Sequence, residues 1–300
     1  MSTITYDIRA AETLPDVFPA MSQRGRLFTF ARRHPTIVIG STLLLLLVLV
    51  AIFAPWLGTV DPTALAPARR TRPPSEMFWF GTDMLGRDVY SRVLAGTRVS
   101  LIVGFSVAII ASAIGLLIGI LSGYVRILDA ILMRFMDGLM AIPGILLAIA
   151  LMALTRGSVQ NVIIAITIPQ IPQVARLVRG VVLSLREQAF VEAAVASGTR
   201  LPKILWKHVL PNTLAPLTVQ ATFICASAMI TEATLSFLGA GTPPTVPSWG
   251  NIMAEGRALW QVKPYIVFFP AIFLTITVLA VNMLGDGMRD ALDPRLAKRI

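Results

Sequence analysis

The sequence predicts an all-α polytopic membrane protein with six transmembrane helices, and three observations carry that prediction. Of its 300 residues, 55% are hydrophobic and only 14% are charged, a composition that does not suit a soluble domain. Uncharged apolar runs near the length of a membrane span recur along the chain. Most basic residues flank these runs, so membrane orientation explains the net charge of +10 better than binding to nucleic acid does.

Residues 1–35 form a polar tail without an evident cleavable signal, because its charged region is too long and the apolar run comes too late. The first transmembrane helix is expected at 36–56. Its 37–54 stretch holds no charge and crosses most of a hydrocarbon core at about 1.5 Å per residue.

Residues 57–98 are expected to form an extracytoplasmic segment that ends in an amphipathic entry helix. Asp83 is predicted to cap that helix, because its carboxylate can accept hydrogen bonds from the free N–H groups of a first turn. Arg87, Asp88 and Arg92 are spaced to form ion pairs on it.

Small residues recur at every fourth position of the second span, 99–123, which carries no charge. They are Ala111, Gly115, Gly119 and Gly123. We interpret them as a helix-packing face, since a smooth stripe lets another helix approach closely. A partner subunit and another span of the same chain are equally good candidates for the contact.

The third and fourth spans are expected at 138–154 and about 159–174. A short polar connection precedes the third span and contains Arg126, Asp129, Arg134 and Asp137. Pro143 is predicted to kink the third span, because proline removes a backbone donor.

A polar, basic segment at 186–211 interrupts the apolar runs. The sequence Glu192-Ala193-Ala194 favours a helix, and Gly198 is expected to stop it because glycine adopts a left-handed backbone at little cost. Apolar residues at helical spacing predict a second helix up to Leu210-Pro211, where the next apolar run begins. The segment therefore predicts an amphipathic elbow along the membrane surface.

Span five is expected near 213–238 and span six near 266–284. Glu232 is costly inside a span unless it is paired or hydrated, and we interpret it as part of an outer gate or an inter-span pair. Polar side chains of spans four and five give a possible translocation path, with helix-to-helix hydrogen bonding as the alternative. This set contains Asn161, Gln170, Gln173, Thr218, Gln220, Ser227 and Glu232. Beyond span six, a glycine stop is expected to precede a short charged helix that Pro294 ends.

Six spans place both termini on one side of the membrane. With the termini inside, sixteen lysines and arginines lie near the inner ends of the spans and nine near the outer ends. The excess predicts a cytoplasmic location for both termini and for the 186–211 segment.

Three motifs resemble one protein family. They are W-F-G-T-D-M-L-G-R-D-V-Y-S-R at 79–92, the spacing Glu-Ala-Ala, Gly and Leu-Pro at 192–211, and N-M-L-G-D-G-M-R-D-A-L-D-P-R at 282–295. Together they are similar to the C-type permease subunits of bacterial ABC importers for dipeptides, oligopeptides, nickel and glutathione. The sequence departs from the family pattern at His208, where isoleucine is usual, and at Ser248, where an acidic residue is usual.

The resemblance implies a type I ABC importer permease fold, with a core at 99–286, a coupling loop at 186–211 and a cytoplasmic tail at 287–300. It implies that the coupling loop docks on ATPase subunits through Glu192, Ala193, Ala194, Gly198, Leu210 and Pro211. The implied partners are a homologous second permease subunit, two ATPase subunits, and a periplasmic or lipid-anchored solute-binding protein in the bacterial inner (plasma) membrane. ATP and Mg²⁺ are expected in the ATPase subunits.

The chain itself is expected to be non-catalytic and to bind no cofactor. It has no G-x-x-x-x-G-K-[ST] phosphate loop, and two separated histidines with one cysteine do not make a metal site. The expected solute is a di- or oligopeptide or a glutathione-like peptide, with nickel or another small solute as the alternative. An ion-coupled secondary transporter is a more distant alternative function, because the sequence shows no evident inverted repeat and no evident mid-membrane pair of acidic residues. A pore made of two copies of this chain, without a second kind of permease subunit, is also an alternative.

Overall fold

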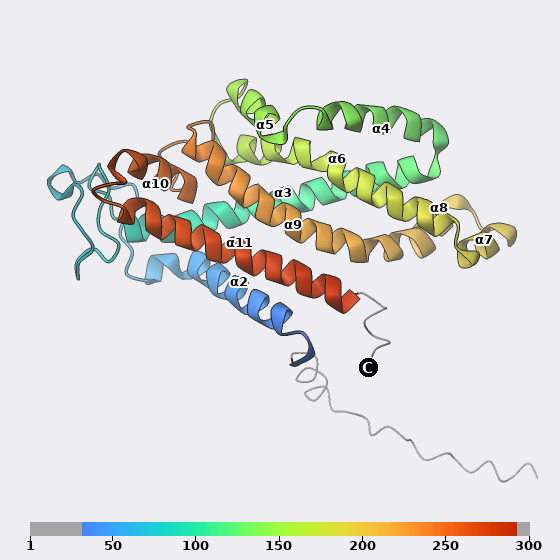
Figure 1. Ribbon diagram of the computed structural model, residues 1–300, viewed down its shortest axis with the longest axis horizontal. Coiled ribbons are helices and arrows are strands. Elements are labelled where there is room, and N and C mark those ends of the chain that lie inside the picture. Colours follow the sequence, from blue (N-terminus) through green and yellow to red (C-terminus); the bar gives the residue numbers. More distant parts are fainter. Residues whose placement is uncertain (1–31, 293–300) are drawn as a thin grey trace, which may run out of the picture.

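A computed structural model describes residues 32–292 of the chain, and it is an elongated helical bundle (Figure 1). Its helices are α2 Pro35–Phe53, α3 Val89–Tyr124, α4 Arg126–Met140, α5 Gly144–Ala153, α6 Val159–Arg186, α7 Ala189–Ala196, α8 Leu201–Ile204, α9 Leu210–Phe237, α10 Trp249–Gly256 and α11 Tyr265–Leu292. Short helical turns are η1 Ala54–Trp56, η2 Pro67–Arg69, η3 Leu205–Val209 and η4 Arg257–Leu259. The predicted all-α class is confirmed.

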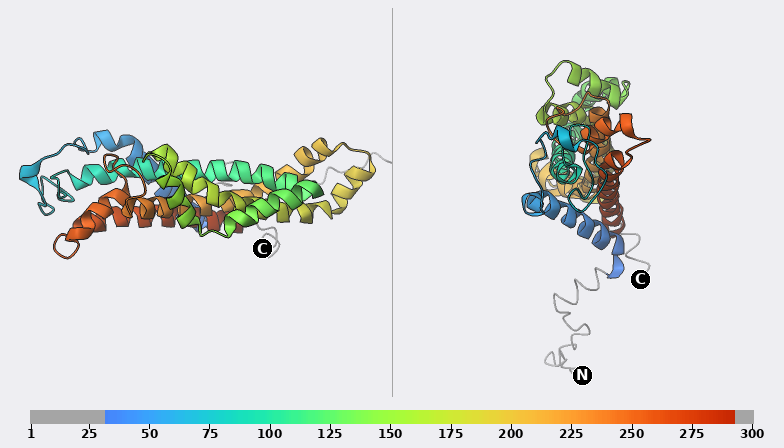
Figure 2. Two further views of the ribbon diagram at one scale, coloured as in Figure 1. Left: turned by 90° about the horizontal axis from the view of Figure 1, so that it is seen from above. Right: turned by 90° about the vertical axis from the view of Figure 1, so that its left-hand side faces the viewer.

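Five helices in the described residues are long and apolar enough to cross a membrane. They are the segments Pro35–Trp56, Val89–Tyr124, Val159–Arg186, Leu201–Phe237 and Tyr265–Leu292. The bent pair of α4 and α5 gives a sixth candidate, which matches the six spans expected from the sequence. The long helices run roughly along one axis, with α7 and α8 at one end and the 57–88 segment and α10 at the other (Figure 2).

The third span is interrupted at Pro143 as predicted, but the bend is larger than a kink, because α4 and α5 meet at 85°. The break falls just before Pro143, which has no N–H to continue a helix. The expected polar connection is itself helical, since α4 begins at Arg126. Its acidic residues form ion pairs with α6. Asp129 lies 2.5 Å from Arg179, and Asp137 lies 2.6 Å from Arg176.

The glycine stripe of α3 packs against α6 of the same chain. A Cβ added at Gly119 would lie 2.6 Å from Cβ of Val178 and 2.7 Å from the carbonyl oxygen of Ala175. A Cβ added at Gly115 would lie 2.4 Å from the side chain of Val174, and one added at Gly123 would lie 2.6 Å from the side chain of Val182. The sequence left open whether the stripe contacts a partner subunit or another span of the same chain, and the structure shows the contact with a span of the same chain. Ala111 is fully buried beside it.

Helix α3 begins at Val89 and is capped by Asp88, whose carboxylate accepts a hydrogen bond from the Ser91 N–H at 2.9 Å. The prediction that Asp83 caps this helix is therefore wrong. No separate entry helix precedes the second span, because α3 runs without a break through residue 98.

The predicted glycine stop after span six is also wrong, since α11 continues through Gly285 and Gly287 to Leu292. These glycines serve close packing instead. A Cβ at Gly285 would lie 2.1 Å from Oγ1 of Thr222 in α9, and one at Gly287 would lie 2.5 Å from a side-chain carbon of Ile37 in α2. The expected ending at Pro294 and most of the two tails lie outside the described residues.

Candidate functional site

An ordered elbow joins α6 to α9 and contains the predicted helix, glycine turn and helix. After α7, the N–H of Gly198 donates to the carbonyl of Val195 at 2.9 Å, and the N–H of Thr199 donates to Ala194 at 3.0 Å. This pair of bonds is the Schellman motif, which needs a left-handed residue at its centre. Gly198 supplies it with φ of +73°, and nothing lies within 4 Å of an added Cβ. Backbone conformation, not crowding, therefore requires glycine here.

The second half of the elbow differs from the prediction of a separate surface helix. Helical structure continues from Leu201 to Phe237, through α8, the η3 turn and α9. In the π-helical η3 turn, the N–H of Leu210 donates to Leu205, five residues back. Pro211 gives the physical reason, because its ring has no N–H and crowds the carbonyl four residues earlier, which a wider turn relieves. The elbow is thus continuous with a membrane-length helix.

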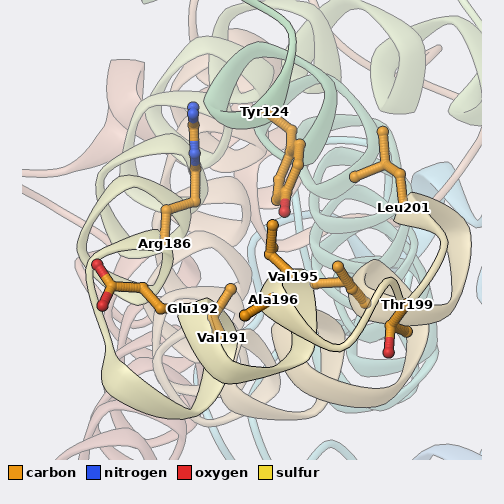
Figure 3. A pocket seen from close by; sticks show the side chains of 9 residues that line it. Tyr124, Arg186, Val191, Glu192, Val195, Ala196, Thr199 and Leu201 are labelled. Atoms are coloured by element: carbon orange, nitrogen blue, oxygen red, sulfur yellow. The ribbon is translucent and has the colours of Figure 1, made fainter.

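A pocket of about 590 Å³ separates the elbow from the ends of α3 and α6 (Figure 3). Tyr124 and Arg186 line it from the bundle, and Val191 and Val195 line it from α7. Arg186 donates to the carbonyl of Gly123 at 2.9 Å, and its guanidinium lies 5.0 Å from the centre of the Tyr124 ring. These contacts hold the end of α6 on α3, so the elbow starts from a fixed point.

The six predicted coupling residues fall into two groups by exposure. Glu192, Ala193, Gly198 and Pro211 are exposed, whereas Ala194 and Leu210 are half-buried. Ala194 packs against the apolar core of the bundle. The elbow therefore offers an exposed small-residue surface on an anchored base, which suits contact with another protein.

The sequence reasoning missed two exposed aromatic side chains of the elbow. Trp206 is 75% exposed and Phe190 is 44% exposed. The Phe190 ring lies 6.0 Å from that of His208, the position at which the chain departs from the family pattern. An aromatic residue in an otherwise basic segment was the available signal, because large exposed apolar side chains mark interaction sites.

A second cavity, which we call the polar pocket, lies at the break between α4 and α5 and has a volume of about 300 Å³. It brings together three of the seven residues predicted for a translocation path: Gln170 and Gln173 of α6 and Ser227 of α9. Nε2 of Gln170 lies 3.4 Å from Oγ of Ser227. Thr231 also lines it and was missed.

The other four predicted path residues lie elsewhere. Asn161 donates to the carbonyl of Arg156 at 2.7 Å, and Thr218 donates to Ala215 on its own helix at 2.8 Å. Gln220 lines a different cavity with Phe223 and Arg289. Asn161 and Thr218 are each nine residues from a pocket residue of their own helix and so face the opposite side, whereas Gln220 shares a face with Ser227 but lies about two turns away along α9.

Glu232 is fully buried near the end of α9. Its carboxylate accepts a hydrogen bond from Ser236 at 2.9 Å, one turn along the same helix. Ser236 in turn lies 3.2 Å from the hydroxyl of Thr242 in the following loop. Among the described residues no basic side chain pairs with Glu232, so it belongs to a buried polar cluster outside the polar pocket.

Four charged side chains form a cluster at the end of the bundle opposite the elbow. The Asp83 carboxylate is 2.7 Å from Nε of Arg87 and 2.5 Å from Nη1 of Arg92. Glu255 of α10 pairs with both arginines. The prediction that Asp88 joins these ion pairs is wrong, because Asp88 caps α3. Nothing in the sequence indicated that Glu255 joins this cluster, because it is 163 residues from Arg92 in the chain.

At the family's acidic position, Ser248 accepts a hydrogen bond from the N–H of Asn251 at 3.3 Å and caps α10. The adjacent Trp249 is fully buried and donates its indole N–H to the carbonyl of Val93 at 3.0 Å. These two contacts order the start of α10 and fasten it to α3.

A bundle of membrane-length helices with an exposed, ordered elbow and a polar pocket open at its surface suits a transport permease. The chain belongs to the family of binding-protein-dependent transport system inner membrane components, which matches residues 115–298. The N-terminal transmembrane domain of oligopeptide transport permease C matches residues 27–74. The protein is thus a multi-pass, non-catalytic inner-membrane component of an ABC transport system.

Several relatives cover nearly the whole chain. A probable peptide ABC transporter permease of Sinorhizobium fredii is 52% identical, covering 90% of this chain and 92% of the relative. The glutathione transport system permease of Escherichia coli is 44% identical, covering 89% and 88%. The dipeptide transport system permease of Alkalihalophilus pseudofirmus is 40% identical, covering 94% and 93%.

Among solved structures, an inward-facing form of the MetNI methionine ABC transporter resembles this chain with a TM-score of 0.55 and 22% identity. The match covers 67% of this chain and 96% of that chain. It supports the ABC importer permease fold.

Proposed function

We propose that this ABC permease subunit carries a short peptide, a dipeptide, oligopeptide or glutathione-like solute, across the inner membrane. The observation that carries the proposal is that relatives described as peptide, dipeptide and glutathione permeases are 40% to 52% identical along its length. A nickel solute is the alternative, and the polar pocket does not favour it, because none of the described residues that line it is a histidine, a cysteine or an acidic residue.

In this proposal the elbow is the docking site for an ATPase subunit. Glu192, Ala193 and Gly198 present the exposed surface, and Trp206 adds an apolar contact that a partner would cover. Leu210 and Pro211 set the turn through which the elbow returns to α9. ATP and Mg²⁺ belong to the two ATPase subunits, and this chain binds neither.

The proposed complex contains a homologous second permease subunit as the other half of the pore and a solute-binding protein that delivers the peptide. The elbow and both termini lie in the cytoplasm, and the 57–88 segment lies outside. The excess of lysine and arginine on the elbow side supports that orientation.

Motion of the ATPase subunits reaches the pore through the elbow. Helical structure is unbroken from Leu201 to Phe237, so displacement of α8 moves a helix that lines the polar pocket. Rigid-body movement of this helix against α6 then alternates access between the two sides of the membrane.

Purification of the tagged chain from its native membrane tests the proposal. We expect the second permease and the ATPase subunits to co-purify, and proteoliposomes containing the complex with the binding protein to take up labelled dipeptide with ATP. Uptake that persists without ATP and stops when ion gradients collapse would instead show a secondary transporter. Uptake of nickel ions but not of peptide would assign the alternative solute.

A further inference from the structure

The polar pocket lies where the break between α4 and α5 meets a stretch of α6 that contains two prolines, and helix lengths place it near the middle of the membrane. At about 1.5 Å per residue, Gln170 lies about 17 Å along α6 from Val159, and Ser227 lies about 15 Å along α9 from Phe237. Those two helix ends lie at the same end of the bundle (Figure 1). A hydrocarbon core is about 30 Å thick, so both side chains sit near its middle.

The break before α5 contacts the stretch of α6 that contains the prolines. A Cβ added at Gly144, where α5 begins, would lie 3.3 Å from Cβ of Pro169 in α6. Pro169 and Pro172 each remove an N–H from α6, which leaves carbonyl groups without their helical donors. Irregular backbone at membrane depth is tolerated where it is buried in protein or lines a hydrated cavity. The polar pocket provides such a cavity.

The side chains that line the polar pocket have a distinct chemistry. Gln170, Gln173, Ser227 and Thr231 provide amide and hydroxyl groups, which both donate and accept hydrogen bonds. None of the described residues that line it is charged. The contact between Gln170 and Ser227 is long, at 3.4 Å, so these groups retain capacity for a ligand.

We propose that the polar pocket is a solute-contact site that binds the backbone amides of a peptide in transit, with Gln170, Gln173 and Ser227 as the contact residues. Peptide amides carry one donor and one acceptor each, which glutamine side chains complement independently of the peptide's own side chains. The inference rests on the proposed function and assigns to this chain a contact with the peptide backbone rather than with its charged ends.

Uptake of labelled alanyl-alanyl-alanine by proteoliposomes containing the whole transporter tests the site. The variants Gln170→Leu and Gln173→Leu keep side-chain bulk and remove hydrogen bonding, and Ser227→Ala is the third. With the binding protein saturated, we expect uptake by Gln170→Leu to fall roughly tenfold, because one or two hydrogen bonds to the solute are lost. Gln170→Asn should recover part of the uptake, because it restores an amide group. ATP hydrolysis stimulated by loaded binding protein should persist, which shows that the complex still assembles.

Gln220→Leu is the matched control, because it makes the same change in a span but lies in a different cavity. Its uptake should equal that of the unmodified complex. Equal uptake by the unmodified complex and all three pocket variants would overturn the inference while leaving the proposed function intact. An unmodified complex that moves nickel ions and no peptide would overturn both.

A modified solute gives a sharper measurement. Replacing one amide N–H of the tripeptide by an ester oxygen should slow uptake by the unmodified complex once the binding protein is saturated. In Gln170→Leu the two solutes should be carried at nearly equal rates, because the contact is already lost. An equal slowing in both complexes would show that Gln170 does not contact the backbone.

Discussion

Arg92 and Asp83 form a buried ion pair, with Nη1 of the arginine 2.5 Å from Oδ2 of the aspartate and each side chain 1% exposed. Asp83 lies in the 57–88 segment, Arg92 lies in the first turn of α3, and Glu255 extends the cluster to α10. The cluster thereby fastens the 57–88 segment and the start of α3, which are consecutive in the chain, to the distant helix α10 at one end of the bundle.

Removing one charge from this cluster should destabilise the protein, because the remaining buried charges lose their compensation. We expect Asp83→Asn to lower the free energy of unfolding by about 3 kcal/mol, seen as an earlier thermal transition in detergent. The matched change Asp137→Asn breaks an exposed pair with Arg176 and should have little effect. Equal transitions for the two variants would contradict a stabilising role for the cluster.

Close packing between α3 and α6 gives a second prediction. In Gly119→Ala the new Cβ meets Val178 at 2.6 Å, so the helices must separate, at about 1–3 kcal/mol. Adding Val178→Ala to that variant should restore part of the thermal stability. Gly180→Ala is the control on α6, because nothing lies within 4 Å of its new Cβ and alanine favours a helix. A melting temperature unchanged by Gly119→Ala would contradict the packing.

The sequence predicted features that depend on composition and local backbone chemistry. Apolar runs identified the spans, because burial in lipid requires them wherever a helix crosses. Gly198 marked the elbow turn, since a left-handed residue after a helix favours glycine. The spacing of Gly115 and Gly119 marked a packing face, although the identity of the partner helix required the structure.

Features that depend on distant residues could not be predicted. The charges of α4 were assigned to a loop because their partners on α6, Arg176 and Arg179, follow much later in the chain. Gly285 was assigned to a helix stop, since a glycine chosen for close packing has the same sequence signature. Similarly, sequence alone did not separate Gln170 from Gln220, because the direction of each side chain depends on how α6 and α9 pack.

The orientation of the chain in the membrane can be measured with single cysteines. Cys225 is the natural cysteine and is 3% exposed, so background labelling should be low. A membrane-impermeant maleimide should label Lys203→Cys in the elbow only in inverted vesicles, and Glu76→Cys in the 57–88 segment only in right-side-out vesicles. Both substituted positions are exposed. The reverse pattern would place the elbow outside and contradict its proposed contact with an ATPase.

Gly198 allows the coupling role of the elbow to be separated from its folding. Its φ of +73° costs a non-glycine residue about 1–2 kcal/mol, and asparagine and aspartate tolerate that conformation best. Gly198→Asn and Gly198→Asp therefore place similar strain on the turn, but only aspartate adds a charge to the exposed surface that we propose for docking.

We expect the Gly198→Asp complex to stay at least weakly assembled while ATP hydrolysis is uncoupled from uptake, and Gly198→Asn to retain more coupling. The number of peptides carried per ATP hydrolysed in proteoliposomes measures this directly. If the elbow is the docking site, a charge on its exposed surface disturbs the contact itself, whereas strain in the turn affects both variants alike. Normal solute-stimulated transport by Gly198→Asp would show that the ATPase engages the chain elsewhere.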